Sequence, residues 1–374
     1  WRGEEEEERK RVLVVGGSGY LGQHLLAALA ASSTADRLDV AFTHHSPTPP
    51  QPLLDALPSV RAFRADLCSG DGFEAISASF GQPHVVVNCA AMSVPRACEM
   101  DPPAAMATNV PSSLVNWLLS FGNDDSLLIH LSTDQVYEGV KSFYKEEDET
   151  MPVNMYGKSK VAAEKLIIEK CSNYAILRSS IIYGPQTISP VAKSLPIQWM
   201  DGVLSQGQQV EFFNDEFRCP VYVKDMVDVV LSLTKTWLSA IAFHCTMVTD
   251  IKVHAADGKK VQVLLNVGGP DRVSRLQMAE SVAIVRGYNP SIIKSVSASS
   301  SFKALPVLAL SKDNSIQLQH SGGSTLIFVA AQYLALISNP TLGHERAMGE
   351  SHSHIFVGTS SKHDVQTASL DNLA

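Results

Sequence analysis

The sequence predicts an α/β fold: a doubly wound parallel sheet, with a smaller α/β region toward the C-terminus. Three observations lead to this prediction. Short apolar runs alternate with helix-forming runs through the first half of the chain, as expected when strands and helices are wound about one parallel sheet. A glycine-rich turn joins the first apolar run to the first helix-forming run. Further along, Tyr156 and Lys160 lie four residues apart in a helix-forming run.

The chain begins with a charged stretch. Residues 1–10 contain an unbroken acidic run, Glu4 to Glu8, and we expect a disordered acidic tail there. A secretory signal would be basic and then apolar, and no such pattern is visible. The first residue is Trp1, so we expect the natural start to lie upstream.

Composition limits the classes of function. The 374 residues are 45% hydrophobic, enough to form one large domain or two modest ones. A net charge of -8 argues against nucleic acid or an anionic membrane as a partner, and no apolar run is long enough to span a bilayer. The six cysteines show no CxxC spacing, which is typical of free thiols in a reducing compartment. We therefore expect a cytoplasmic protein.

The glycine-rich turn is the first candidate for ligand binding. It follows the apolar run Arg11–Val15, which suits a buried parallel strand, and it opens a helix predicted over residues 21–31. In a GxxGxxG turn the first glycine permits a tight turn, the second lets the backbone approach a pyrophosphate, and the third lets the helix pack close to the strand. The helix N-terminus adds free N–H groups for phosphate; an ordinary tight turn is the alternative. The candidate cofactor-binding residues here are Gly16, Gly19, Tyr20, Leu21 and Gly22.

The end of the second predicted strand, Leu38–Phe42, bears on the choice of cofactor. An NAD site usually carries a carboxylate there, which binds the 2′-hydroxyl of the adenosine ribose. This chain has Thr43 and His44 instead, which leaves room for a 2′-phosphate. We therefore predict NADP as the cofactor, with NAD as the alternative. His44 and His45 make a poor metal site, because adjacent side chains on a strand point apart.

Two further strands are predicted after a proline-rich loop over residues 47–58. They cover residues 60–65 and 84–88. A carboxylate just after the third strand could accept a hydrogen bond from the adenine amino group, or could cap a helix. The small residues after the fourth strand suit the passage of the nicotinamide-side ribose. The candidates at these two strand ends are Asp66, Leu67, Cys89, Ala90 and Ala91.

The candidate catalytic residues follow the fifth predicted strand, Leu127–Leu131. Thr133 lies at its carboxyl end, where ligands bind in open parallel sheets. Tyr156 and Lys160 share one face of a helix predicted over residues 155–170. An ammonium group one turn away should favour the phenolate and lower the phenol pKa from about 10, while the Thr133 hydroxyl could hold a substrate oxygen. The alternative is a surface tyrosine beside solvated lysines.

The second half of the chain is less regular. Strands are predicted at 175–177 and 261–267, and a capping box at Ser274–Gln277 predicts a helix to about Arg286. We predict a dinucleotide-binding domain over residues 11–180. A smaller substrate-binding region should cover 181–296, with an insertion near 240–256. Residues 297–374 should form an atypical, poorly ordered tail.

Taken together, residues 11–296 resemble the extended short-chain dehydrogenase/reductase superfamily. The stretches Tyr144–Asp148 and Pro152–Lys158 are similar to its dTDP-4-dehydrorhamnose reductase branch, which includes the regulatory beta subunit of methionine adenosyltransferase. This resemblance implies a Rossmann-type NAD(P)-binding sheet. It also implies that Tyr156 passes a proton, that Lys160 also binds the nicotinamide ribose, and that Thr133 orients the substrate oxygen.

The resemblance gives two main hypotheses about function. The first is an NADP-dependent reductase of a nucleotide-linked 4-keto-6-deoxy sugar; a nucleotide-sugar epimerase would use the same three residues. Gln135 stands where the related dehydratases carry a glutamate base, which disfavours dehydration, and loss of water from a dTDP-hexose would contradict this. The second hypothesis is a non-catalytic NADP-binding regulator with the methionine adenosyltransferase catalytic subunit as its partner. A third alternative is a chain that has neither role. The chain could also form a homodimer.

Overall fold

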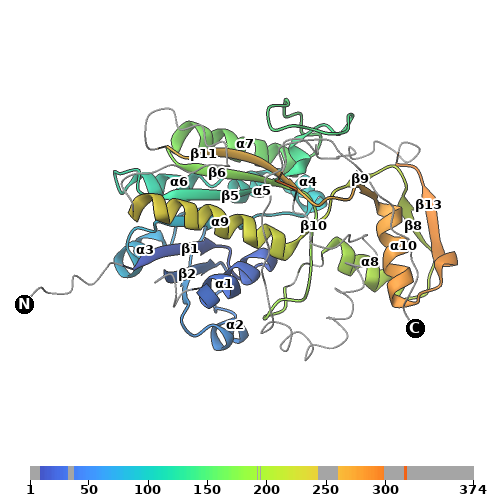
Figure 1. The fold of residues 1–374 in the computed structure, drawn as a ribbon, viewed down its shortest axis with the longest axis horizontal. Helices are drawn as coiled ribbons and strands as arrows, with labels where there is room; N and C mark the ends of the chain where they lie inside the picture. The colour runs from blue at the N-terminus through green and yellow to red at the C-terminus, as the bar shows by residue number, and fades with distance from the viewer. Residues whose placement is uncertain are drawn as a thin grey trace, which may run out of the picture.

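The computed structural model describes residues 9–32, 38–191, 193, 195–242, 260–298 and 316–317. Within these ranges, Figure 1 shows a large sheet with helices on it and a smaller region at one end. Three predicted features lie wholly or largely outside the described residues: the acidic tail up to residue 8, the insertion from residue 243 onward, and the tail apart from residues 297–298 and 316–317.

One parallel sheet of eight strands forms the centre of the large body, in the order β14-β11-β6-β5-β4-β1-β2-β3. The chain adds strands on one side of β1 and then, from β4 onward, on the other, so the predicted doubly wound sheet is confirmed. The strands are β1 (Lys10–Val15), β2 (Leu38–His44), β3 (Arg61–Arg64), β4 (Val85–Asn88), β5 (Leu127–Thr133), β6 (Tyr174–Ser179), β11 (Gln262–Gly268) and β14 (Ile316–Gln317).

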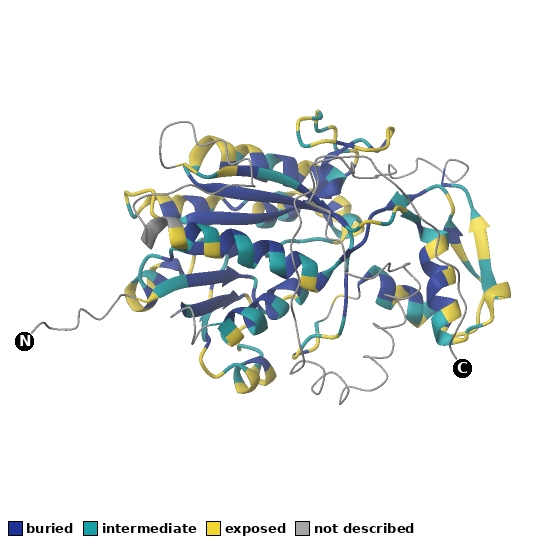
Figure 2. Ribbon diagram, in the orientation of Figure 1, coloured by how far each residue is buried: buried dark blue, intermediate teal, exposed yellow. Residues whose placement is uncertain are grey.

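Helices cover both faces of this sheet, which is why its central strands are almost continuously apolar (Figure 2). Val12, Leu13 and Val14 of β1, for example, are 0% exposed. One face is covered by α1 (Tyr20–Ser32), α2 (Gln51–Ala56) and α9 (Val223–Ala242). The other carries α3 (Phe73–Phe80), α6 (Ser112–Leu119) and α7 (Met155–Lys170), with α4 (Pro95–Met100) and α5 (Pro102–Asn109) packed against α7.

The smaller region has an apolar core of its own. Its helix α10 begins at the predicted capping box, where the Ser274 hydroxyl accepts a hydrogen bond from Gln277 N at 3.1 Å and the Gln277 side chain accepts one from Ser274 N at 2.8 Å. Its elements are β7 (Ile182–Tyr183), α8 (Pro196–Leu204), β8 (Val210–Phe213), β9 (Phe217–Arg218), β10 (Val221–Tyr222), β12 (Val273–Ser274), α10 (Arg275–Arg286), η2 (Pro290–Ile292) and β13 (Ile293–Val296).

The structure differs from the sequence prediction in three places. The proline-rich stretch at 47–58 contains the short helix α2, because Pro52 lies in its first turn, where the missing N–H costs no helical hydrogen bond. Strand β5 runs on to Thr133, so Thr133 ends the strand instead of following it. Helix α9 runs to Ala242 and so reaches into the insertion that was predicted near 240–256.

Ile316 and Gln317, which lie in the predicted tail, pair with Val267 and Gly268 of β11. No helix in the described part of the chain is both long enough and apolar enough to cross a bilayer.

Candidate functional site

The glycine-rich turn lies between β1 and α1 and is tightly packed. Gly16 has φ +74°, and a Cβ added there would lie 2.8 Å from the backbone nitrogen of Ala90, so only glycine fits. A Cβ at Gly22 would lie 2.6 Å from Gly16 O. Gly19 is exposed, and its N–H donates to Gly16 O at 3.0 Å. The turn therefore presents bare backbone at the carboxyl edge of the sheet.

Neighbouring strand ends hold this turn in place. The hydroxyl of Thr43, at the end of β2, accepts a hydrogen bond from Gly16 N at 3.1 Å. At the end of β4, Cys89 N donates to Val15 O at 2.9 Å, and Ala90 and Ala91 follow. Burial raises the pKa of the Cys89 thiol to about 12, so this thiol is neutral. The candidate cofactor-binding residues at the ends of β1, β2 and β4 therefore lie together at the carboxyl edge of the sheet.

The first turn of α1 contacts a segment from the smaller region. Tyr20 Oη donates to Pro185 O at 3.0 Å. The buried Gln23 side chain donates to Ser189 O at 2.9 Å and accepts from Ser189 N at 2.8 Å. The Leu21 side chain belongs to the core of the sheet, which leaves its backbone as the part that could meet a ligand.

The ends of β2 and β3 carry the residues predicted around the adenosine. Burial lowers the pKa of His44, so His44 does not supply a cation there. Arg64 is its partner in the β2–β3 register and is exposed; it was missed in the sequence because it lies on the neighbouring strand, and the sequence does not show which strands pair. Asp66 Oδ1 accepts from Cys68 N at 2.7 Å, and its other oxygen is 3.7 Å from His45 Nε2. Asp66 therefore closes a local turn and does not cap α3.

Leu67, the next predicted residue, is partly buried against the core beneath α3 and α6. Neither this edge nor any other part of the described chain gathers three or more His, Cys, Asp or Glu side chains that could hold a metal ion.

The predicted catalytic residues meet where the end of β5 faces the start of α7. Asn154 caps this helix by accepting from Gly157 N at 2.7 Å. A Cβ at Gly157 would lie 2.2 Å from Gln135 O, so this glycine lets α7 pack against the turn η1 (Asp134–Val136). As a result Tyr156 comes within hydrogen-bonding reach of the Thr133 side chain.

Burial controls the ionisation of this site. Tyr156 and Lys160 are 8% and 2% exposed. Burial raises the pKa of Tyr156 well above its ordinary value, although a hydrogen bond with Thr133 opposes this change. The lowered phenol pKa that the sequence spacing suggested is therefore wrong. Lys160 Nζ donates to Leu131 O at 2.7 Å, and burial lowers its pKa to about 8. The phenol is thus held in its protonated, proton-donating form.

A second set of buried polar residues, which we call the rear network, links α7 to the sheet. It consists of Ser132, Tyr137, Glu164, Arg178 and Asn266. Arg178 Nη2 is 2.7 Å from Glu164 Oε2, and Arg178 Nη1 donates to the Tyr137 hydroxyl at 2.7 Å. The Ser132 hydroxyl donates to Glu164, and Tyr137 donates to Asn266 Oδ1 at 2.7 Å. The network fixes Glu164, one helical turn after Lys160, to β5 and β6.

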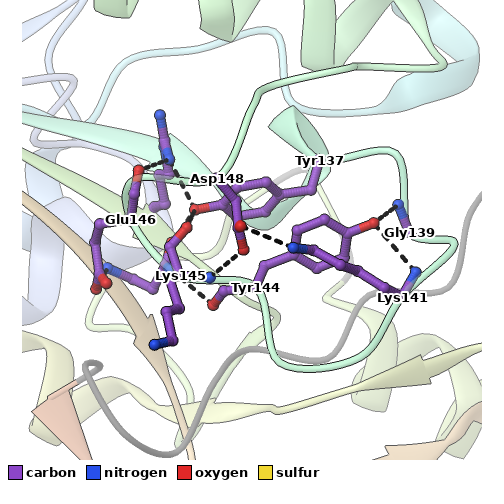
Figure 3. Close-up of polar contacts among 9 residues, drawn as sticks. Tyr137, Gly139, Lys141, Tyr144, Lys145, Glu146 and Asp148 are labelled. Carbon is purple, nitrogen blue, oxygen red and sulfur yellow. Dashed lines mark hydrogen bonds and ion pairs between the residues drawn. The ribbon is translucent and has the colours of Figure 1, made fainter.

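The rear network also anchors the loop over residues 137–148 (Figure 3). The rings of Tyr137 and Tyr144 stack with their centroids 4.6 Å apart. The Glu146 carboxylate accepts from Asn266 N at 2.8 Å, and near the loop surface Lys141 Nζ is 2.7 Å from Asp148 Oδ1. Residues 144–148, which carry part of the family resemblance, therefore secure a loop to the sheet.

A third set, the junction network, connects the end of β5 with the smaller region. It consists of Asp134, Glu216, Arg218 and Arg275. Asp134 Oδ2 is 3.8 Å from Arg218 Nε. Arg218 Nη2 and Arg275 Nη2 each lie 3.0 Å from Glu216 Oε1. Sequence reasoning missed this network because its members come from separate elements; the one available signal was the carboxylate of Asp134 directly after Thr133.

Residues 10–306 match the family described as the RmlD substrate binding domain. Among curated proteins, the chain is similar to methionine adenosyltransferase 2 subunit beta from Pongo abelii, with 34% identity over 156 residues. That alignment covers 41% of this chain and 45% of the relative, so the chain spans about half the length of this curated relative.

Solved structures share the fold at low sequence identity. One is dTDP-4-dehydrorhamnose reductase from Bacillus anthracis in complex with NADP: TM-score 0.61, 16% identity, covering 87% of this chain and 99% of that chain. Another is UDP-glucuronic acid 4-epimerase from Bacillus cereus in complex with UDP-glucuronic acid and NAD: TM-score 0.66, 19% identity, covering 88% and 99%. These likenesses establish the Rossmann-type fold.

Proposed function

This chain belongs to the RmlD substrate binding domain family, and we propose that it is an NAD(P)-dependent reductase of a nucleotide-linked 4-keto-6-deoxy sugar. The family match and the shared fold support the general role of an NAD(P)-binding short-chain dehydrogenase/reductase. The observation that carries the proposal is the meeting of Thr133, Tyr156 and Lys160, all buried, at the carboxyl edge of the sheet that also bears the glycine-rich turn.

The residues present fit a dinucleotide. Gly16 and Gly22 leave no space for a side chain, Gly19 is exposed, and α1 begins directly behind them. Backbone N–H groups at a helix N-terminus bind phosphate, so this turn would hold the pyrophosphate. Lys160 would donate to the nicotinamide ribose. When bound, the nicotinamide would supply the hydride for the keto carbon.

The chain's own residues would manage the proton. Tyr156 is buried and protonated, so it can donate its phenol proton to the keto oxygen as that oxygen gains negative charge. Thr133, within reach of the phenol, would orient the oxygen. The ammonium of Lys160, one turn along α7, would offset the negative charge left on the phenolate.

The test is oxidation of NADPH and NADH with dTDP-4-keto-6-deoxy-L-mannose. We expect Tyr156→Phe to lower turnover by roughly 10²- to 10⁴-fold, the range for loss of a general acid. Tyr288→Phe is the matched control: it removes a phenol that donates to Asp201 in the smaller region, and it should retain turnover. Tight NADPH binding without turnover in the wild type would exclude this reaction for this substrate.

For the cofactor, we propose NADP over NAD. The support is the absence of a carboxylate after β2 and the exposed Arg64 beside His44 at that edge. Arg64→Ala should weaken NADPH binding roughly tenfold or more and leave NADH binding nearly unchanged, because only NADPH carries the 2′-phosphate. The control is Arg61→Ala, at the other end of the same strand, where Arg61 pairs with Asp39. If Arg64→Ala weakened the binding of NADPH and of NADH equally, the proposed preference for NADP would be contradicted.

A second candidate is a regulatory subunit of methionine adenosyltransferase that binds the cofactor without turnover. The support is the 34% identity to the beta subunit. Co-expression with a methionine adenosyltransferase catalytic subunit separates the two candidates: a stable complex that lacks reductase turnover favours regulation, whereas turnover without a complex favours the reductase.

A further inference from the structure

One buried amide joins the glycine-rich turn to a segment that comes from another part of the sheet. Gln23, in the first turn of α1, is 1% exposed. Its Nε2 atom donates to Ser18 O in the glycine-rich turn at 2.9 Å and to Ser189 O at 2.9 Å. Its Oε1 atom accepts from Ser189 N at 2.8 Å. An amide side chain has two N–H donors, so both donors of Gln23 are committed to linking these two stretches of backbone.

We call residues 184–189 the strap. Its first residues pack closely on α1, because a Cβ at Gly184 would lie 3.0 Å from Tyr20 Oη. Next along the strap, Pro185 O accepts a hydrogen bond from Tyr20 Oη at 3.0 Å, and His24 Nε2 lies 3.3 Å from the same oxygen. The start of the strap is therefore held on α1 by hydrogen bonds, as its end is.

The strap spans the point where the strand order of the sheet reverses. It follows β6 and β7, and β6 lies on the β4 side of β1, whereas α1 follows β1 itself. The chain therefore passes the switch point between β4 and β1 to reach α1. A few residues later Lys193 Nζ donates to Ser93 Oγ at 2.7 Å, in the loop after β4. Ligands of open α/β sheets bind at this switch point, so the chain has fixed points on both sides of the proposed dinucleotide site.

The strap has little besides hydrogen bonds to hold it down. None of its residues belongs to an apolar core cluster in the described part of the chain. Its isoleucine, Ile188, is 41% exposed, and the strap forms neither helix nor strand. Segments with few buried apolar contacts open locally at a low cost in free energy. The strap can therefore separate from α1 without unfolding the sheet.

We propose that the strap is a gate for the dinucleotide and that Gln23 is the positioning residue that holds this gate closed. The inference rests on cofactor binding in the proposed function. A dinucleotide whose pyrophosphate lies on the glycine-rich turn passes the strap when it enters and when it leaves. Each passage breaks the two hydrogen bonds between Gln23 and Ser189 and leaves these polar groups without partners until the strap closes again. The bonds therefore slow entry and release alike.

Stopped-flow fluorescence of NADPH with the full chain measures both rates. Gln23→Met keeps the length of the side chain and removes its hydrogen bonds to Ser18 and Ser189. We expect association and dissociation each to become roughly tenfold faster, the effect of one or two lost hydrogen bonds. The Kd should then change little. If Gln23 only shaped the turn, dissociation alone would become faster. Gln277→Met, the same substitution at the exposed capping box of α10, is the control and should leave both rates unchanged.

A second variant loosens the strap from its own side. The Thr187 hydroxyl donates to Ser189 O at 2.7 Å, so Thr187→Val should raise both rates by about threefold, the effect of one weaker hydrogen bond. This variant tests the gate if Gln23→Met does not fold. Unchanged rates, or a rise in dissociation alone, would overturn the proposal while NADPH binding stands. If the wild type did not bind NADPH, the proposed function would fail and the gate with it.

Discussion

The rear network is buried throughout, and the junction network is buried except for Arg275, which is partly exposed. Both networks pair carboxylates with guanidinium groups, yet they differ in how completely they are paired. In the rear network, Arg178 and Glu164 are 5% and 4% exposed, and Arg178 Nε is 3.1 and 3.2 Å from the two carboxylate oxygens. In the junction network the contact between Arg218 and Asp134 is 3.8 Å, and one oxygen of Asp134 has no hydrogen bond within the described residues.

This difference indicates different tasks. A buried polar network with every group paired fixes its members in one arrangement, whereas an incompletely paired one is costly and marks a place where another role is served. The rear network holds α7, which carries the candidate residues Tyr156 and Lys160, against the sheet. The junction network lies beside the candidate residue Thr133 and connects the end of β5 to the smaller region.

The largest expected effect is at Arg178. Arg178→Met leaves the Glu164 carboxylate buried without its cation, and we expect a loss of about 3–5 kcal/mol in the free energy of unfolding. Denaturant titration measures this loss. Adding Glu164→Gln should recover much of it, because the uncompensated charge is then removed. A loss below about 1 kcal/mol for Arg178→Met would mean that the rear network does not stabilise the fold.

A smaller loss is expected at Tyr137. Its hydroxyl bonds to Arg178, Asn266 and Lys145 O, so Tyr137→Phe should cost about 2 kcal/mol by leaving buried groups unpaired. Hydrogen exchange should rise in the loop 137–148, which this residue anchors. Unchanged exchange there would show that the loop is held by other contacts.

The junction network should tolerate a lost cation better. We expect Arg218→Met to cost about 1–2 kcal/mol at neutral pH, because Arg275 still compensates Glu216. Without Arg218, the pKa of the buried Asp134 rises further above its value in the unfolded chain. As the pH falls, the folded state of the variant therefore takes up this proton more readily than the unfolded state does. The deficit relative to wild type should therefore shrink toward acid pH. If Arg218→Met lost more free energy of unfolding than Arg178→Met, the junction network would be the more stabilising of the two, contrary to our expectation.

The smallest effect is expected at the loop surface, where Lys141 is half exposed and pairs with Asp148. Lys141→Met should change the free energy of unfolding by less than about 1 kcal/mol, as for other exposed pairs. The hydrogen bond from Lys141 lowers the pKa of Asp148, so the contribution is present at neutral pH and is lost as the pH falls through that lowered pKa. Unfolding measured across the acid range at low and high salt checks this.

Local sequence determined the elements on which the site is built. The apolar run 11–15, the glycines of the first turn and the capping residues Asn154 and Ser274 act over a few residues, through sterics and short-range hydrogen bonds. The structure accordingly begins and ends α7 at the predicted residues and starts α10 at the predicted capping box. The short helix α2 was missed because prolines indicate a loop unless the first turn of a helix is recognised.

Tertiary structure alone decided the ionisation of Tyr156 and the buried networks that hold the site in place. The spacing of Tyr156 and Lys160 indicated a lowered phenol pKa, but burial, which depends on the whole fold, raises it. Tyr137 and Asn266 bond across 129 residues of sequence, and Arg218 reaches Asp134 from a different region. Such pairs depend on the order of strands in the sheet and on the packing of the smaller region. No local pattern encodes them, because each side chain carries only half of the interaction.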